Sequence, residues 1–253
     1  MDKPAAKPIR LYHFTSKEFA IQDIVKQRLK IARIMELNDP FEFVGADLEN
    51  RMWRATMNGM KEAYNDKFGL ICFSRTWRDP VQWSHYADHH KGICLGFDVP
   101  PHLPVQVNYV RSRSPIPIAP HEINLDPDDP VLTEIFKSAM RTKFAHWSYE
   151  DEFRLFTDLN EAEYNVAAEK NLYFANFNVG LTLREVIVGA NCTSTPEEIS
   201  EALTEYKGVV VRKARPAYRT FRMVEQKHEL YWKYPPERSV YDPSPVIVIN
   251  KES

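Results

Sequence analysis

The segment Ile9-Arg10-Leu11-Tyr12-His13-Phe14-Thr15 has the alternating pattern of a strand, and it ends at Ser16. Serine is a preferred N-cap residue, and apolar side chains then recur at helical spacing over residues 17–27. We therefore expect a strand over residues 9–15, followed directly by a short amphipathic helix.

Strands and helices continue to alternate outward from this segment. We expect further strands over residues 29–34, 70–74, 93–97, 105–110, 149–157, 183–188 and 209–214, and helices over residues 41–66, 80–90, 131–145 and 161–169 and after Thr195. Residues 111–130 are rich in proline and aspartate, which predicts a long irregular connection. The chain has no internal repeat or strong linker. The pattern predicts one α+β domain over residues 1–230 and an extended C-terminal arm over residues 231–253.

The composition excludes several classes of function. The chain has 253 residues, with 33 Lys and Arg against 35 Asp and Glu, for a net charge of −2. A neutral chain can hold nucleic acid or anionic lipid only through a local patch. Only 8 glycines are present, against 18 prolines, which argues against glycine-rich nucleotide-binding loops. No apolar run approaches about 20 residues, so we expect no membrane partner.

The number and spacing of the cysteines indicate the cellular compartment in which we expect the protein. Cys72, Cys94 and Cys192 lie far apart and form no C-x-x-C pair, which argues against a structural zinc site. Free thiols and an N-terminus without an apolar signal segment are typical of a cytoplasmic protein.

Three clusters of polar residues are candidates for a site. The first is His13 with Thr15 at a strand end, where an imidazole and hydroxyl groups between aromatic rings suit a ribose or amide ligand. A half-exposed histidine on an ordinary strand would show the same pattern.

The second cluster comprises Ser74-Arg75 and the segment from Trp83 to His90. On a helix, Trp83, Tyr86 and His90 share one face, either as a ligand platform or as core. His85 and His89 have the i, i+4 spacing of a helical metal pair, but the residue after His85 is Tyr86, where a metalloprotease helix has glutamate.

The third cluster is Glu150-x-Glu152-x-Arg154. On a strand these three side chains project from one face, which is also typical of a solvated edge strand. In a buried site, the arginine keeps one carboxylate ionised and like-charge repulsion raises the pKa of the other.

The motifs together resemble a known family. They are Leu11-Tyr12-His13-Phe14-Thr15-Ser16, Leu37-Asn38-Asp39-Pro40-Phe41-Glu42, Cys72-Phe73-Ser74-Arg75, Trp83-Ser84-His85-Tyr86-Ala87, His90-Lys91-Gly92-Ile93-Cys94-Leu95-Gly96-Phe97-Asp98 and Trp147-x-x-Glu150-x-Glu152-x-Arg154. In order and spacing, from about residue 11 to Gly189, they resemble the bacterial domain-of-unknown-function family 2971. More distantly, they resemble the ADP-ribosyltransferase superfamily.

The second resemblance implies a fold and a chemistry. It implies a mixed, split central sheet with flanking helices, and cleavage of the nicotinamide glycosidic bond of NAD. It implies that His13 binds ribose, that Tyr86 stacks on nicotinamide and that Glu152 polarises the nicotinamide ribose. Glu150 and Arg154 would complete the catalytic set. Ser74 falls where one branch carries a strand serine, and the residues expected to bind NAD are His13, Thr15, Ser74, Arg75, Trp83 and Tyr86.

Two other functions fit the same residues. A metal-dependent hydrolase would use His85, His89 and a carboxylate such as Asp88, Glu150 or Glu152. A non-catalytic module would only bind a ligand. We expect NAD as substrate and no bound metal. The sequence does not distinguish a protein acceptor from a nucleic-acid acceptor, nor a monomer from an oligomer.

Overall fold

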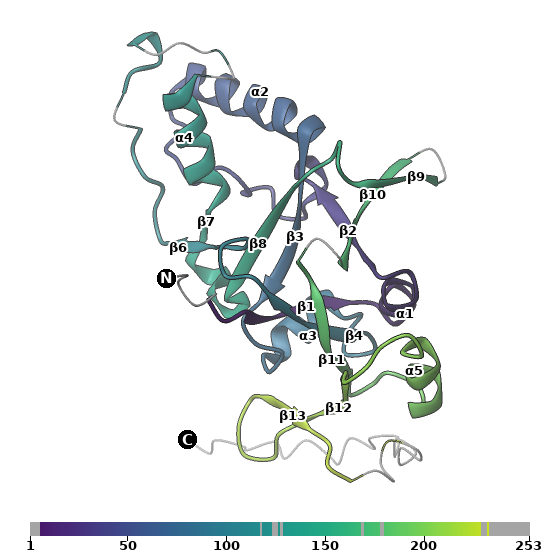
Figure 1. The fold of residues 1–253 in the computed structure, drawn as a ribbon. Helices are drawn as coiled ribbons and strands as arrows, with labels where there is room; N and C mark the ends of the chain where they lie inside the picture. Colours follow the sequence, from purple (N-terminus) through teal and green to yellow (C-terminus); the bar gives the residue numbers. More distant parts are fainter. Residues whose placement is uncertain are drawn as a thin grey trace, which may run out of the picture.

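An eleven-stranded mixed sheet runs through the molecule, with helices packed against it (Figure 1). The computed structural model describes residues 6–116, 118–122, 126, 129–167, 170–177, 180–228 and 232. The strands of this sheet are β1 (Ile9–Thr15), β2 (Arg28–Arg33), β3 (Phe68–Ser74), β4 (Ile93–Val99), β5 (Val105–Gln106), β8 (Glu152–Asp158), β9 (Glu163–Ala167), β10 (Lys170–Asn176), β11 (Thr182–Val188), β12 (Val210–Pro216) and β13 (Met223–Glu225).

The strand order is β13-β12-β11-β4-β1-β3-β2-β10-β9, with β8 paired to β3 and β5 paired to β8. The pair β11–β12 is parallel and the others are antiparallel. A separate parallel pair joins β6 (Asn108–Val110) to β7 (Thr142–Phe144). This mixed architecture confirms the α+β class.

Five helices of 7 to 17 residues and three 3₁₀ turns connect the strands in the described part of the chain. They are α1 (Lys17–Lys26), α2 (Arg51–Lys67), α3 (Pro80–Tyr86), α4 (Pro130–Met140) and α5 (Pro196–Ala202), with the 3₁₀ turns η1 (Ile34–Glu36), η2 (Pro120–Glu122) and η3 (Ala145–Glu150). Within the described ranges, no helix has both the length and the apolar character needed to cross a membrane.

The core has three parts, on two faces of the sheet. Ile71 and Ile93 point to the face that α1 and α5 cover. Their neighbours Leu70 and Cys94 point to the other face, as strand geometry requires. On that second face, Leu70 packs with α2 and α4, and Cys94 packs with Trp83 of α3. Figure 1 shows α2 and α4 together at one end of the molecule.

The sheet is split between β1 and β3. Strand β1 pairs with β4 over seven residues, but it pairs with β3 only at Tyr12 and Ser74. Strand β3 pairs with β2 at Gly69 and Leu70, so its backbone between Leu70 and Ser74 has neither β1 nor β2 as a partner. This is the point at which the cavity described below forms.

Four predicted helices differ from the structure. The helix expected over residues 41–66 begins only at Arg51, because Asn50 caps it and Phe43 has a left-handed backbone. The helix expected over 80–90 ends at Tyr86, since Asp88, His89 and His90 are all left-handed.

The helix expected over residues 131–145 ends at Met140, and the chain then forms β7 against β6. No helix occurs in the described part of residues 161–169. Strands β9 and β10 pair with each other there, and β10 also pairs with β2. Tertiary strand pairing overrides the local helix preference of this Glu- and Ala-rich segment.

The strand expected over residues 149–157 is β8, which begins only at Glu152. The strand over residues 105–110 is divided into β5 and β6, which pair with β8 and β7. The sheet continues beyond β12 to β13. The expected C-terminal arm lies outside the described residues except for Trp232, whose indole N–H donates to the Ser194 carbonyl at 3.0 Å.

Candidate active site

A cavity of about 300 Å³ opens where the sheet splits. Segments far apart in the sequence meet there, namely β1, η1, β3, α3, β7, η3, β8 and the loop before α2. The side chains that line it are Tyr12, His13, Phe14, Glu36, Leu37, Asn38, Glu42, Cys72, Phe73, Ser74, Gln82, Tyr86, Lys143, Glu150 and Glu152. His13, Tyr86 and Glu152, the three residues singled out by the resemblance, thus share one cavity.

His13 bridges the split in the sheet. Its Nδ1 lies 2.9 Å from the carbonyl oxygen of Cys72 on β3. Because a carbonyl oxygen only accepts, Nδ1 carries the hydrogen and Nε2 is left as an acceptor. Burial lowers the pKa of His13, although the bond to Cys72 opposes this shift. The imidazole is therefore neutral near pH 7, with a lone pair on Nε2.

Tyr86 stands at the end of α3, which begins at Asp79 and Pro80 in a standard N-cap arrangement. Its hydroxyl donates to Glu150 Oε1 at 2.5 Å. Burial and the charge of Glu150 raise the pKa of Tyr86, so the phenol stays protonated. Gln82, one turn earlier, donates to Ser74 Oγ at 2.9 Å and to the Tyr149 carbonyl at 3.0 Å. These bonds fix α3 against β3 and η3.

Glu152 lies at the start of β8 and is 4 % exposed. Arg154 binds both its oxygens, with Nε 2.8 Å from Oε1 and Nη2 3.1 Å from Oε2. Burial alone would raise the pKa of Glu152, but the charge and hydrogen bonds of Arg154, together with Lys143, lower it to about 2. This carboxylate is ionised at every physiological pH.

Glu150 is the second carboxylate, and the structure corrects its position. It does not lie on the strand with Glu152 but at the end of η3, separated from β8 by the left-handed Asp151. Burial raises the pKa of Glu150, and this outweighs the opposing effect of Lys143. The pKa values of the two carboxyl groups shift in opposite directions, and burial raises the pKa of Glu150 more than repulsion by Glu152 does.

Two further charged residues, Lys143 and Glu42, contact these carboxylates and Arg154, and neither was among the candidate site residues predicted from the sequence. Lys143 on β7 places its Nζ 2.7 Å from Glu150, 3.2 Å from Glu152 and 3.1 Å from Glu42. Glu42 also accepts from Arg154 Nη2 at 2.8 Å. Glu42 could have been predicted as a site residue, because it belongs to one of the quoted motifs. Lys143 could not, because no motif includes it and its segment was expected to be the end of a helix.

We refer to Glu42, Lys143, Glu150, Glu152 and Arg154 as the charge cluster. All five residues are buried, none being more than 7 % exposed. Buried charges are tolerated when each is paired and hydrogen-bonded, as here. Four of these residues, Glu42, Lys143, Glu150 and Glu152, line the cavity, so part of its wall carries fixed charges.

Of the other four residues expected to bind NAD, one lines the cavity and three do not. Ser74 lines the cavity, but its Oγ bonds to Gln82 and Thr76 rather than to Glu152. Thr15, Arg75 and Trp83 are not among the lining residues. Arg75 lines a neighbouring polar cavity and stacks on Phe153 at 4.6 Å. Trp83 is fully buried and packs edge-on against Phe14, so it belongs to the core.

The metal pair expected from His85 and His89 does not form on a helix. Helix α3 ends at Tyr86, and His89 follows in a left-handed conformation, so the i, i+4 relation is lost. His85 instead lies 3.2 Å from the Tyr149 hydroxyl. Among the described residues, no group of three or more His, Cys, Asp or Glu side chains is arranged to hold a metal.

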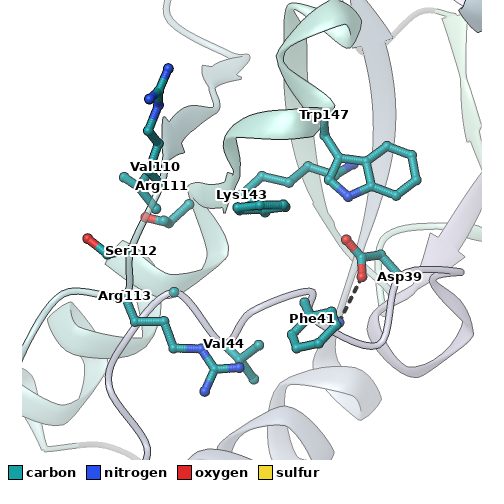
Figure 2. Close-up of a pocket in the computed structure, with 12 residues that line it drawn as sticks. Asp39, Phe41, Val44, Val110, Arg111, Ser112, Arg113, Lys143 and Trp147 are labelled. Carbon is teal, nitrogen blue, oxygen red and sulfur yellow. Dashed lines mark hydrogen bonds between the residues drawn. The ribbon is translucent and has the colours of Figure 1, made fainter.

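A second cavity, of about 280 Å³, shares the lining residue Lys143 with the first (Figure 2). It is walled mainly by aromatic and aliphatic groups, including Phe41, Phe144 and Trp147. Lys143 lines both cavities and lies 4.9 Å from the Trp147 ring centre. Figure 2 shows Arg113 turned toward Phe41, with its guanidinium 5.7 Å from the ring centre.

Comparison of this chain with protein-family models, with curated proteins and with solved structures finds no match. The two resemblances therefore rest on the quoted motifs alone, and the site must be judged from its geometry.

Proposed function

We propose that the protein cleaves the nicotinamide glycosidic bond of NAD and transfers ADP-ribose to a macromolecular acceptor. The observation that carries the proposal is the convergence of His13, Tyr86 and Glu152 on one cavity. These residues come from β1, α3 and β8, and only the folded chain brings them together.

The cavity offers matching groups for the nicotinamide half of the substrate. Nε2 of the neutral His13 accepts a hydrogen bond from a ribose hydroxyl. The rings of Phe14, Phe73 and Tyr86 provide aromatic surface for the cationic nicotinamide ring. A volume of about 300 Å³ is at the small end for ligand sites. The ADP half needs further space, and the candidate for it is the second cavity, which shares Lys143 with the first and is lined by Arg113.

The reaction breaks the bond between ribose C1′ and the nicotinamide nitrogen. Its electron pair returns to the ring, which leaves as neutral nicotinamide, and the ribose becomes an oxocarbenium ion. The ionised Glu152 stabilises this positive charge. An acceptor hydroxyl or amine then bonds to C1′ and releases a proton. Glu150, whose pKa is raised, takes that proton. Arg154 acts through Glu152 as a positioning residue.

One observation favours a second function, a module that binds NAD without cleaving it. Both oxygens of Glu152 are already bonded to cations, Arg154 and Lys143. Such a carboxylate has less free charge to offer an oxocarbenium ion. We also propose a cytoplasmic location, which the free thiols of Cys72, Cys94 and Cys192 support.

The experiment is titration of NAD into the full chain, combined with measurement of released nicotinamide. We expect saturable binding and slow release. The variant His13→Ala should weaken binding by about tenfold, since one hydrogen bond and its geometry are lost. The matched control is His102→Ala, an exposed histidine outside the cavity. Binding without release would favour the module, and an absence of binding would contradict both functions.

A further inference from the structure

A basic, aromatic hairpin projects from the edge of the sheet. It consists of β12, the turn over residues 217–222 and β13, and we call it the basic hairpin. Figure 1 shows it at the end of the molecule away from α2 and α4. The Ala217 amide donates to the Arg222 carbonyl at 2.9 Å, and the Met223 amide donates to the Arg78 carbonyl at 2.8 Å. The turn is thus anchored at its base.

Two aromatic side chains of this turn are almost fully exposed. Tyr218 is 89 % exposed and Phe221 is 97 % exposed, the highest values among the large apolar side chains described. Arg215 stacks on Tyr218 with 4.5 Å between the guanidinium carbon and the ring centre. Two aromatic rings exposed to this extent within one six-residue turn are available to a binding partner.

Positive charge surrounds these rings. Residues 212–228 contain six Lys and Arg but only one acidic residue, Glu225, which pairs with Arg212 at 2.8 Å. Arg219 and Arg222 have no ion-pair partner within the described part of the chain. In a chain whose net charge is −2, this is the kind of local patch that an anionic polymer requires.

A groove continues the patch toward the body of the protein. A cavity of about 440 Å³ is lined by Arg78, Arg215, Tyr218, Arg219 and Lys227, among others. Arg78 also lines the neighbouring polar cavity, where Arg75 and Arg212 lie beside the carboxylates Glu185 and Glu225. The lining of this groove therefore supplies four cations, Arg78, Arg215, Arg219 and Lys227.

We propose that the basic hairpin binds single-stranded nucleic acid, with unpaired bases stacked on Phe221 and Tyr218 and the phosphates near Arg215, Arg219, Arg222 and Lys227. Aromatic rings interleaved with cations are the usual way to bind single strands without sequence preference. A duplex keeps its base faces covered, and an acidic protein would use the arginines but not the rings. This inference does not depend on the proposed NAD cleavage.

The test is fluorescence anisotropy of the full chain with labelled 20-nucleotide single strands, oligo-U and oligo-dT, and with a duplex of equal length, all without NAD. We expect tighter binding of at least one single strand than of the duplex. Phe221→Ala should weaken that binding about fivefold or more. The matched control is Phe19→Ala, an exposed phenylalanine of α1, which should have no effect.

The charge contribution is tested by salt dependence. The double variant Arg219→Ala/Arg222→Ala should lower the slope of log affinity against log salt by about 1.4, from about 0.7 per phosphate contact. Removing the exposed Lys26 and Arg51 of α1 and α2 should leave the slope unchanged. Three results would each overturn the proposal: no binding at low salt, equal binding of the duplex, or equal effects of Phe221→Ala and Phe19→Ala. So would competition by polyglutamate that is insensitive to Phe221→Ala, which would indicate an acidic protein partner.

Discussion

The carboxylate of Glu152 combines two properties that are seldom found in one residue, burial and a pKa of about 2. Glu152→Gln keeps the shape but removes the charge, so we expect NAD cleavage to fall about a hundredfold or more. The sequence alone predicts normal folding for this variant. The structure instead predicts a loss of about 2 kcal/mol in unfolding free energy, because Arg154 stays buried with a weaker partner.

The control for this variant is Glu185→Gln. Glu185 also pairs with two arginines, Arg10 and Arg212, but it lies outside the cavity. It should cost some stability and leave NAD cleavage intact. Initial rates should be measured well below the melting temperature of each variant. If Glu152→Gln retains full cleavage, Glu150 becomes the candidate for its role.

At the scale of single elements, substituting alanine for Gly92 and for Gly59 should change the unfolding free energy in opposite directions. A Cβ at Gly92 would overlap the carbonyl oxygen of Thr15 and lie 2.9 Å from the backbone of Ala87. Gly92→Ala should therefore destabilise the link between α3 and β4 by about 2 kcal/mol or more. Gly59 lies within α2 with nothing within 4 Å of its Cβ position, so Gly59→Ala should stabilise by about 0.5–1 kcal/mol. Urea titration measures both, and a loss at Gly59 or a gain at Gly92 would contradict the packing described.

Helix α1 carries a buried carboxyl group, Asp23, whose pKa burial raises to about 7 despite the nearby Arg28. A folded-state pKa above the unfolded value means that ionisation opposes folding, so the penalty appears as pH rises from about 4 to about 7. Asp23→Asn mimics the protonated form. It should raise the unfolding free energy by about 2–4 kcal/mol at pH 8 and change it little at pH 4. Glu18→Gln, an exposed change on the same helix, is the matched control. Equal effects of Asp23→Asn at both pH values would argue against a buried, raised-pKa group.

At the scale of the whole molecule, we expect the purified protein to carry no stoichiometric transition metal. The helical pair on which a hydrolase would depend is broken at Tyr86, and Lys143 and Arg154 occupy the space between the carboxylates. Cations placed there repel a metal ion. Elemental analysis after gel filtration measures this. The result that would contradict this expectation is about one metal per chain, with NAD cleavage lost on chelation and restored by that metal. It would favour the metal-dependent hydrolase.

The sequence by itself determined the elements whose signals are local. Ser16 caps α1 and Thr195 caps α5, each accepting from the backbone amide three residues later, as expected. Strands β1 and β4 lie where their apolar patterns place them. Caps and periodicity act within one turn of chain, so they can be recognised without knowing the partners of an element. His13, Tyr86 and Glu152 were singled out by the resemblance that the order of motifs carries, and the fold brings them to one cavity.

Only the tertiary structure decided where the remaining parts lie. The segment over residues 163–167 is a strand because β10, itself paired to β2, offers it backbone partners, and not because of its own composition. Lys143 is part of the site because carboxylates from three separate segments surround its ammonium group. Trp83 is core because Phe14 and Trp77 enclose it. Such outcomes depend on contacts between distant residues, whose energies are absent from any local stretch of sequence.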